Sequence, residues 1–241
     1  MPKALVIIPT YNEIENIESI IRAVFSLTEP FHVLIVDDNS PDKTSEKVIE
    51  LQKEYPTSLF LEKGLKKSGL GTAYVRGFRW ALARDYHFIF EMDADFSHNP
   101  NDLEKLLNAC RSEGADLAIG SRYVTGVNVV NWPLNRVLMS YFASVYVKII
   151  TGMKIHDATA GFKCYSRKVL EAMDLDKIKF IGYAFQIEMK YRTFAKNFRI
   201  VEVPIIFTDR TKGQSKMSSA IFKEAIFGVI ALRIRKMFRR L

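Results

Sequence analysis

The stretch HVLIVDDNSPDKTSEKVIELQKEYPTSLFLE, His32–Glu62, contains the unit that decides the fold. Its apolar ends, HVLIVDD and LFLE, have the composition of buried strands, and residues 42–55 between them have a helical pattern. The same alternation continues on both sides of this unit. Further strand-like runs are ALVII, FIFEMD and DLAIGS, and further helical patterns cover residues 13–27, 71–84 and 101–112. Near-continuous apolar strands, each followed by a helix, predict an α/β fold with a mostly parallel sheet covered on both faces.

The bulk composition limits the class of protein. A chain of 241 residues is long enough for one large α/β domain or two small ones, and its 48% hydrophobic content excludes a disordered chain. The two cysteines, Cys110 and Cys164, lie far apart, which indicates a reducing compartment and argues against a zinc site or a disulfide framework. The apolar run Ala4–Ile8 is too short for the core of a signal peptide, so we expect a cytoplasmic protein.

The positive charge is concentrated at the end of the chain. The formal net charge is +8, and residues 222–241 contain six basic residues and one acid. Such a cluster suits nucleic acid or an anionic membrane surface, and the apolar neighbours AIFGVIAL favour the membrane. The ordered acidic motifs described below argue against nucleic acid. No uncharged apolar run reaches the ~20 residues of a spanning helix, so we expect peripheral contact with a membrane.

A second candidate for membrane contact is the segment LNRVLMSYFASVYVKIITG, residues 134–152. Arg136, Ser140, Ser144 and Lys148 follow one another at i, i+4 spacing and form one narrow polar stripe on an otherwise apolar helix. The helix could lie at the edge of the core with its stripe in water, or it could lie in a bilayer interface. The basic tail favours the second interpretation.

Polar motifs follow the predicted strands at the edge where ligands bind in such sheets. They are Tyr11-Asn12-Glu13, Asp37-Asp38-Asn39-Ser40 and Asp93-Ala94-Asp95. Two carboxylates one residue apart suit Mg²⁺ or Mn²⁺, which complete their coordination with water and phosphate oxygens. The pair therefore predicts a metal–diphosphate site, whereas a solvated turn that caps the next helix is the alternative.

Other polar residues add to this pattern. Asp37 and Asp38 can accept hydrogen bonds from a base or a ribose, although helix capping is also possible. Gly69 and Gly71 can let the backbone approach a ligand, or can form a tight turn. Arg210 and Lys216 flank Gly213 and can neutralise phosphate, although most such runs are ordinary solvated loops.

Seven segments combine these motifs in one order along the chain. They are PTYNE, VDDNSPDKT, KSGLGTAYVRGF, MDADFSHNP, GSRYVTG, DATAGFKCYSR and RTKGQSKM. Together they resemble glycosyltransferase family 2, the inverting transferases of GT-A fold that use nucleotide sugars, and within it the polyprenol-phosphate (dolichol-phosphate) mannose synthases. The resemblance implies a single Rossmann-like GT-A catalytic domain over residues 1–217, followed by a basic amphipathic helix over residues 218–241.

The resemblance also implies roles for single residues. The nucleoside pocket would contain Pro9, Tyr11, Glu13 and Asp38, with Asp37 as a neighbour, and Asp93 would help to bind the donor nucleotide. Asp93 and Asp95 would hold the metal. Arg122, with Arg136 as a second cation, would hold the phosphate of the acceptor. Arg210 and Lys216 would close over the diphosphate of the donor, so that the groups nearest the chemistry are Asp95, Arg122, Arg210 and Lys216.

The function implied by the resemblance is transfer of mannose from GDP-mannose to a polyprenyl (dolichyl-type) monophosphate, with Mg²⁺ or Mn²⁺. A phosphomonoester is largely ionised at neutral pH, so such an acceptor needs no strong base. The alternatives are a polyprenyl-phosphate hexosyltransferase that uses a UDP-sugar, a polysaccharide transferase of the same family and a degenerate nucleotide-binding partner protein. Two departures matter: Ser97 stands where many relatives carry glutamine, and the membrane spans of many relatives are absent. We therefore expect peripheral binding to the cytoplasmic face of a membrane, directly or through a separate small membrane subunit.

Overall fold

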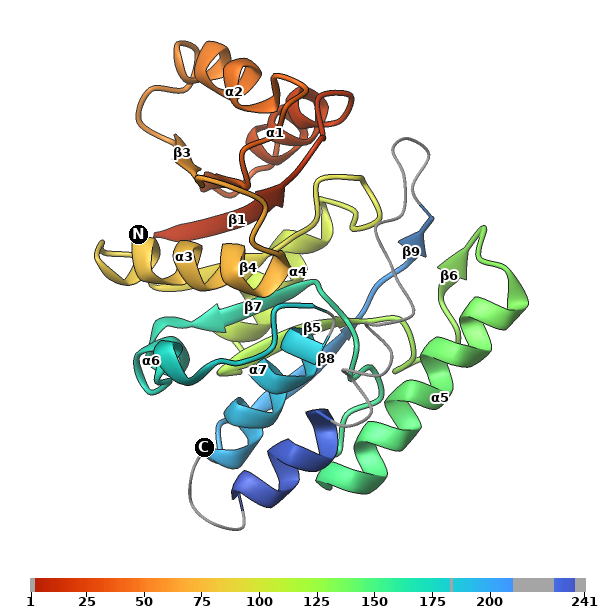
Figure 1. Ribbon diagram of the computed structural model, residues 1–241. Coiled ribbons are helices and arrows are strands. Elements are labelled where there is room, and N and C mark those ends of the chain that lie inside the picture. Colours follow the sequence, from red (N-terminus) through yellow and green to blue (C-terminus); the bar gives the residue numbers. More distant parts are fainter. Residues whose placement is uncertain (1–2, 183, 210–227, 237–241) are drawn as a thin grey trace.

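A seven-stranded sheet forms the centre of the protein (Figure 1). The computed structural model describes residues 3–182, 184–209 and 228–236. The sheet contains β1 (Ala4–Thr10), β2 (Phe31–Asp37), β3 (Leu59–Lys63), β4 (Phe88–Glu91), β5 (Leu117–Ser121), β7 (Lys163–Ser166) and β8 (Ile200–Pro204), in the order β3-β2-β1-β4-β7-β5-β8. A small second sheet pairs β6 (Val129–Val130) with β9 (Phe207–Thr208).

The helices connect these strands. They are α1 (Ile17–Phe25), α2 (Thr44–Gln52), α3 (Leu70–Leu82), α4 (Asp102–Arg111), α5 (Leu134–Thr151), α6 (Arg167–Glu171) and α7 (Ala184–Ala195), with a 3₁₀ turn at Leu175–Lys177. The first helix begins four residues later than its apolar pattern predicts. Glu13 instead accepts hydrogen bonds from the backbone N–H groups of Asn16 and Ile17 through its own carbonyl. The turn leaves Glu13 at the carboxyl edge of the sheet, next to the end of β1.

The strand directions confirm the predicted, mostly parallel sheet. The pairs β1–β2, β2–β3, β1–β4 and β5–β8 are parallel, and β7 runs antiparallel between β4 and β5. Because β7 runs against its neighbours, the residues that precede it lie at the edge where β4 and β5 end. The segment 157–162 is therefore brought to the same edge as the acidic motifs after β1, β2 and β4.

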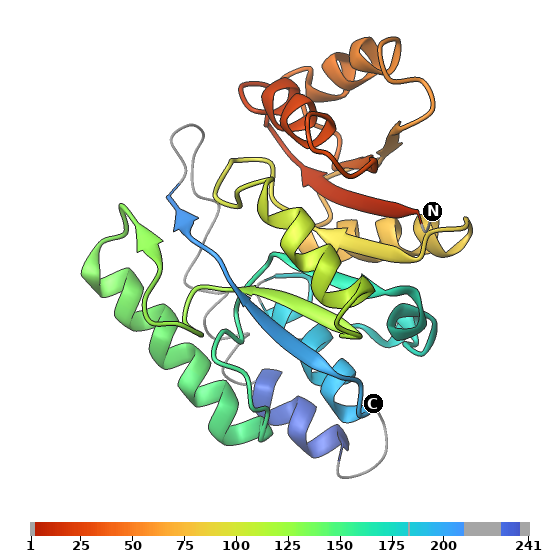
Figure 2. The same cartoon turned by 180° about the vertical axis from the view of Figure 1, so that it is seen from behind.

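Both faces of the sheet are buried, as the apolar strands predict. In β1, Leu5 and Ile7 belong to the core beneath α3 and α7, whereas Val6 and Ile8 belong to the core beneath α1, α2 and α4. Figure 2 shows the molecule from the side that α4 covers. The alternation of side chains along each strand thus fills two cores at once.

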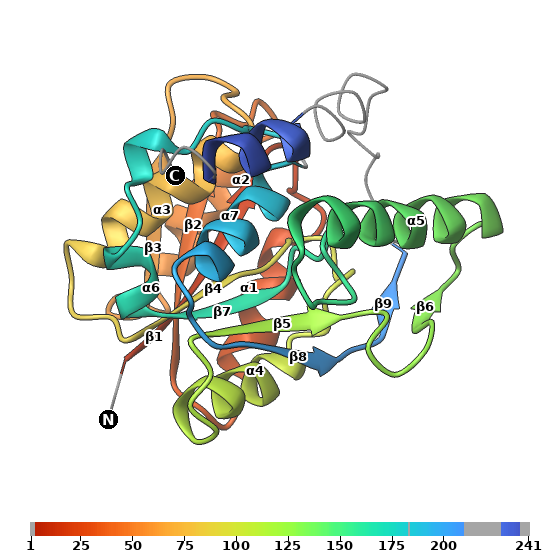
Figure 3. The same cartoon turned by 90° about the horizontal axis from the view of Figure 1, so that it is seen from below.

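Helix α5 lies along the outside of the molecule, beyond the end of the sheet that β5 and β8 form (Figure 3). Part of its polar stripe faces the protein, and large apolar side chains face outward. Ser144 is 2% exposed and its Oγ accepts a hydrogen bond from the backbone N–H of Ala158, at 3.2 Å. Phe142 and Ile149, by contrast, are 62% and 74% exposed. At Ser144 the stripe therefore faces the protein, whereas Arg136 and Ser140 are partly exposed and Lys148 lies in solvent.

The outward face of α5 is made of large apolar side chains. It contains Leu134, Leu138, Met139, Tyr141, Phe142 and Ile149, and we call this set the α5 apolar face. Among the residues that the structure describes, no helix combines the length and the apolar character required to cross a membrane. Residues 228–236 of the basic tail are helical and bury Val229 and Leu232 against the core. The remainder of the predicted tail helix lies outside the described residues.

Candidate active site

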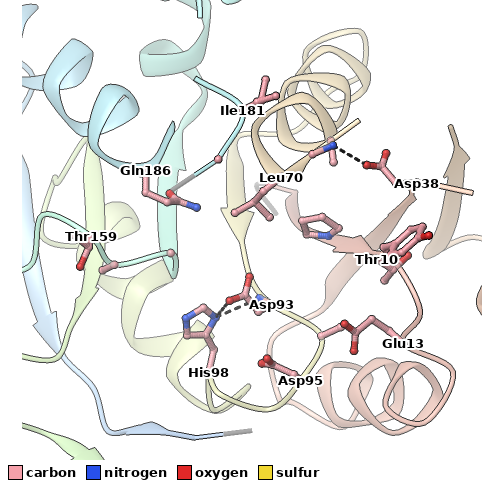
Figure 4. Close-up of a pocket in the computed structure, with 18 of the residues that line it drawn as sticks. Thr10, Glu13, Asp38, Leu70, Asp93, Asp95, His98, Thr159, Ile181 and Gln186 are labelled. Carbon is pink, nitrogen blue, oxygen red and sulfur yellow. Dashed lines mark hydrogen bonds and ion pairs between the residues drawn. The ribbon is translucent and has the colours of Figure 1, made fainter. Parts of the chain in front are cut away.

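A cavity of about 470 Å³ opens at the carboxyl edge of the sheet. Side chains from segments far apart in the sequence line it: Pro9 near the end of β1, Tyr11 and Glu13 after β1, Asp38 after β2, Asp93, Asp95 and His98 after β4, Arg122 after β5, and Gln186 from α7. Figure 4 shows Glu13, Asp38, Asp93, Asp95, His98 and Gln186 around one common space. The structure brings seven of the residues singled out in the sequence to this edge: Pro9, Tyr11, Glu13, Asp38, Asp93, Asp95 and Arg122.

At one end of the cavity Asp38 organises a loop. Its Oδ2 accepts hydrogen bonds from the backbone N–H groups of Ser68 and Gly69, at 2.8 and 3.1 Å, and its Oδ1 lies 3.1 Å from Nη2 of Arg76. The ammonium group of Lys67 lies 4.4 Å from the centre of the Tyr11 ring. The loop is thereby held next to an aromatic ring, as a site for a flat, polar base would require.

Asp37 lies behind the cavity instead of lining it. The side chain is fully buried, and it accepts hydrogen bonds from the hydroxyls of Thr10, Ser40 and Ser45, at 2.8, 2.5 and 2.8 Å. Burial by itself raises the pKa of Asp37, but these donors and the backbone N–H of Ser40 outweigh it and hold the pKa below its usual value. Asp37 therefore fastens the loop that presents Asp38.

Gly69 and Gly71, which could let the backbone approach a ligand, have different surroundings. Gly69 lines the cavity and has a φ of 93°, a conformation that side chains disfavour. Gly71 lies against protein: a Cβ there would be 2.5 Å from the carbonyl oxygen of Phe180. Gly71 thus permits close packing of α3 on the segment before α7.

The acidic pair Asp93 and Asp95 lies at the floor of the cavity. The Asp93 side chain is 39% exposed, and its backbone N–H donates to Nδ1 of His98, at 3.2 Å. Oδ1 of Asp95 accepts hydrogen bonds from the hydroxyl and the backbone N–H of Ser97, at 2.6 and 3.1 Å. Phe96 between them has a φ of 60°, which turns Ser97 back onto Asp95. Ser97 therefore holds the carboxylate of Asp95 through a direct hydrogen bond.

This donor set suits a particular kind of cation. No group of three or more His, Cys, Asp or Glu side chains that could hold a metal occurs within residues 3–182, 184–209 and 228–236. Zinc in a structural site needs four such ligands, whereas Mg²⁺ commonly takes one or two carboxylates and completes its shell with water and phosphates. Asp93 and Asp95 therefore fit a divalent cation that a diphosphate also coordinates.

His98 was not identified from the sequence. It is 2% exposed, its ring stacks on Phe162 at 4.8 Å, and Phe207 meets it edge-on at 5.4 Å. Burial lowers the pKa of His98 to about 4, so the ring is neutral at physiological pH. Because Nδ1 accepts the N–H of Asp93, the proton of the neutral ring is on Nε2. The position of a histidine directly after the DADFS segment was the signal that could have indicated it.

Figure 4 shows Thr159 and Asp38 on opposite sides of the cavity, and Arg122 lies on the side of Thr159. Its guanidinium donates to both carboxylate oxygens of Asp157, from Nε at 2.7 Å and from Nη2 at 2.6 Å, and Nη2 also donates to Thr159, at 2.7 Å. Burial alone raises the pKa of Asp157, but the guanidinium of Arg122 outweighs it and holds the pKa below its usual value. The segment before β7 thus fixes the direction of Arg122.

Arg136 lies near Arg122 but does not line the cavity. Both guanidinium groups lie over the ring of Trp132, at 5.3 Å for Arg122 and 4.1 Å for Arg136. Nη1 of Arg136 donates to Asp209, at 2.9 Å. The structure therefore places the two predicted acceptor cations beside one indole ring. The other two predicted cations, Arg210 and Lys216, lie outside the described residues.

Buried polar side chains support the inner wall of the cavity. Lys190 of α7 is fully buried, and its ammonium donates to the carbonyl oxygens of Ala158 and Ala160, at 2.9 and 2.6 Å. Lys163 of β7 is also fully buried and lies 3.0 Å from Glu91. Burial lowers the pKa of both lysines. Lys190 thus holds the segment 157–161 in place through its backbone carbonyls. The apolar pattern of the sequence does not predict this contact.

Comparison with known sequences places these residues in a family. The sequence model described as Glycosyl transferase family 2 matches residues 5–174. The chain is 47% identical over 97% of its length to a polyprenol monophosphomannose synthase of Mycolicibacterium smegmatis, of which 88% is covered. It is 45% identical over 94% of its length to an undecaprenyl-phosphate mannosyltransferase of Micrococcus luteus, of which 92% is covered. A dolichol-phosphate mannosyltransferase of Pyrococcus furiosus is 38% identical, with 89% of this chain and 59% of that protein covered.

Comparison with solved structures addresses the fold. A glucosyl-3-phosphoglycerate synthase from Mycobacterium tuberculosis, solved in complex with Mn²⁺, UDP and glucosyl-3-phosphoglycerate, has a TM-score of 0.68 at 18% sequence identity, with 98% of this chain and 80% of that chain covered. The same enzyme in complex with phosphoglyceric acid has a TM-score of 0.69 at 17% identity, with the same coverage. At these identities the similarity establishes a shared architecture.

Proposed function

The chain belongs to glycosyltransferase family 2, and from that premise we propose that it transfers mannose from GDP-mannose to a polyprenyl monophosphate, with inversion at the anomeric carbon. The observation that carries the proposal is the arrangement of the cavity. A loop beside an aromatic ring, a pair of carboxylates and a buried arginine all line it. The names of three relatives, each a mannosyltransferase or mannose synthase for a polyprenol-type phosphate, support mannose and the lipid acceptor.

The nucleotide would occupy the end of the cavity formed by Pro9, Tyr11, Glu13 and the loop that Asp38 organises. Asp93 and Asp95 would hold Mg²⁺ or Mn²⁺. The cation would offset the charge that develops on the leaving diphosphate. Ser97 would keep the Asp95 carboxylate directed to it. Arg210 and Lys216 would add positive charge to the same diphosphate.

The acceptor phosphate would bind at the opposite end, at Arg122 with Arg136 beyond Trp132. A phosphomonoester has a second pKa of about 6, so its oxygen is already a nucleophile near neutral pH. The site must then align two anions and neutralise them, and a general base is unnecessary. The ring of His98 is neutral, so it adds no charge between the two substrates.

The lipid chain of the acceptor would remain in a membrane. The α5 apolar face lies on the same helix as Arg136, and the basic tail would add attraction to anionic headgroups. We therefore propose peripheral binding to the cytoplasmic face of a membrane, through α5 and the tail or with a small membrane subunit. In this arrangement the phosphate of a membrane-bound lipid reaches Arg122 from the side of α5.

The experiment uses the full chain with vesicles that contain a polyprenyl phosphate. Labelled GDP-mannose, UDP-glucose and UDP-GlcNAc are supplied in parallel, with and without Mg²⁺ or Mn²⁺. We expect lipid-extractable label from GDP-mannose, dependent on the metal. Asp95→Ala should abolish this label, whereas Asp85→Ala, at an exposed position, should not. Label from a UDP-sugar alone would refute the donor, and absence of lipid product from every donor would refute the reaction.

A further inference from the structure

The amide of Gln186 reaches the cavity from α7, near the acidic pair. The residue is 2% exposed, and it lines the cavity together with Asp93 and His98. Figure 4 shows its side chain directed from α7 into the space above those two residues. The proposed transfer assigns no role to this side chain.

The orientation of the amide is set by a buried cation. The oxygen of the Gln186 side chain accepts a hydrogen bond from the ammonium of Lys163. An ammonium group can only donate, so the amide oxygen must face Lys163 and the NH₂ group must face away from it. The buried network thereby removes the twofold ambiguity of a glutamine amide.

Lys163 is itself held in place. Its ammonium lies 3.0 Å from Glu91, and neither side chain is exposed. The hydroxyl of Tyr165 donates to the other carboxylate oxygen of Glu91, at 2.8 Å. Breaking a buried pair of this kind leaves an uncompensated charge, so the pair holds its geometry firmly. The position of Lys163, and with it the orientation of the Gln186 amide, is thus determined by the core.

The NH₂ group of Gln186 therefore faces the cavity beside Gly161. A Cβ added to Gly161 would lie 3.7 Å from Nε2 of Gln186, 3.6 Å from Cε1 of His98 and 4.0 Å from Oδ2 of Asp93. The absence of a side chain at Gly161 leaves room at that point. A group there lies within reach of an amide donor and next to the carboxylate pair.

We propose that Gln186 binds the hexose of the sugar nucleotide, by donating from Nε2 to a hydroxyl oxygen of the sugar, and that Lys163 is the residue that positions it. This inference rests on the proposed function, because the transferred hexose must lie between the diphosphate at Asp93 and the acceptor at Arg122. Gly161 adjoins both Gln186 and Asp93, and Thr159, two residues before Gly161, accepts a hydrogen bond from Arg122. Hydroxyl oxygens accept hydrogen bonds, and the amide presents N–H donors to them.

A glutamate at this position would act differently. Its carboxylate would pair with Lys163 and would present an acceptor to the sugar in place of a donor. It would also add a negative charge near Asp93 and the diphosphate. The amide thus supplies a hydrogen bond to the sugar without increasing the repulsion at the acidic floor.

The test compares Gln186→Met and Gln186→Glu with the unchanged chain. Methionine keeps much of the volume and removes the donor, and Gln52→Met on α2 is the matched control, since Gln52 donates to a carbonyl far from the cavity. We expect kcat/KM for GDP-mannose to fall about ten-fold in Gln186→Met, the effect of one lost hydrogen bond. In Gln186→Glu, kcat/KM for GDP-mannose should fall further. The affinity for GDP, measured by calorimetry, should change less than about two-fold, because GDP lacks the sugar.

Donors in which single sugar hydroxyls are replaced by hydrogen identify the contact. For the donor that lacks the contacted hydroxyl, Gln186→Met and the unchanged chain should have equal kcat/KM. The double variant Glu91→Gln/Lys163→Gln removes both buried charges and frees the Gln186 amide to turn. It should therefore reproduce part of the loss of kcat/KM for GDP-mannose without weakening GDP binding.

Two negative results have different meanings. If the unchanged chain forms no mannosyl lipid, the proposed function fails. If the unchanged chain is active, and Gln186→Met keeps full kcat/KM or loses the same factor with every deoxy donor, the assignment of Gln186 is refuted while the function stands. Equal loss of GDP and GDP-mannose affinity in Gln186→Met would also refute it, since the effect would then lie in the shape of the site.

Discussion

The pairing of Arg122 with Asp157 predicts a large and specific loss of stability when the carboxylate is neutralised. Asp157 is fully buried, Arg122 is 6% exposed, and the backbone N–H of Arg122 adds a third hydrogen bond to the same carboxylate, at 3.0 Å. Asp157→Asn keeps the shape but turns one acceptor into an NH₂ group that faces the guanidinium. Removal of one partner of a buried pair costs about 3–5 kcal/mol in unfolding free energy.

The assay is thermal unfolding by calorimetry at neutral pH, with denaturant unfolding as a second measure. For a chain of this size, about 1 kcal/mol corresponds to roughly 2–4 °C, so we expect Tm to fall by about 6–20 °C. Asp176→Asn is the matched control. Asp176 pairs with Arg79 at the surface, where the two side chains are 84% and 53% exposed, and such pairs contribute little. A Tm for Asp157→Asn within about 2 °C of the control would refute the reasoning.

The pH dependence gives an independent check with a defined sign. The pKa of Asp157 is lowered in the folded protein, so its contribution to stability is complete above the pKa of the unfolded carboxyl, about 3.9, and is lost as the pH falls through the folded pKa. The stability difference between Asp157→Asn and the unchanged chain should therefore be constant from pH 7 to about pH 5. It should narrow at lower pH, and a difference that grows on acidification would contradict the assignment.

Two further predictions concern the metal and the membrane. Ser97→Ala removes the hydroxyl that holds Asp95, so Mn²⁺ affinity measured by calorimetry with GDP present should fall about ten-fold; an unchanged affinity would contradict the positioning role. Phe142→Asp combined with Ile149→Asp places two charges on the α5 apolar face and should abolish co-sedimentation with anionic vesicles. Ile49→Asp, at an exposed position on α2, is the control, and equal sedimentation of both variants would refute membrane contact through α5.

The sequence contains enough information to predict the sheet and half of the site. Asp93 and Asp95 are neighbours in the chain, and any turn after a buried strand brings both to the same edge. The same reasoning selects Tyr11, Glu13 and Asp38. It does not separate Asp38 from Asp37, because only the side-chain direction at the end of β2 decides which carboxylate meets the cavity and which one meets Thr10.

The other half of the site depends on contacts between distant segments. Arg122 and Asp157 are 35 residues apart, and Lys163 and Gln186 are 23 residues apart. Both pairs form because β7 runs antiparallel between β4 and β5, and the direction of this strand cannot be predicted from its four residues KCYS. A lysine in a strand is ordinarily expected in solvent. Its burial becomes intelligible only when Glu91 is found on the adjacent strand.

Helix α5 shows the limit of a periodicity argument. A period of 3.6 residues identifies the polar stripe, but it does not say which face of the helix meets the protein. Small hydroxyls can be buried cheaply because they bond to nearby backbone: Ser144 bonds to Ala158, and Thr151 donates to the carbonyl of Val147 one turn earlier. The large apolar side chains then remain outside, where water gives them no stabilisation. Such a helix is stabilised by a partly apolar surrounding, and this is the physical basis for the proposal that α5 contacts a membrane.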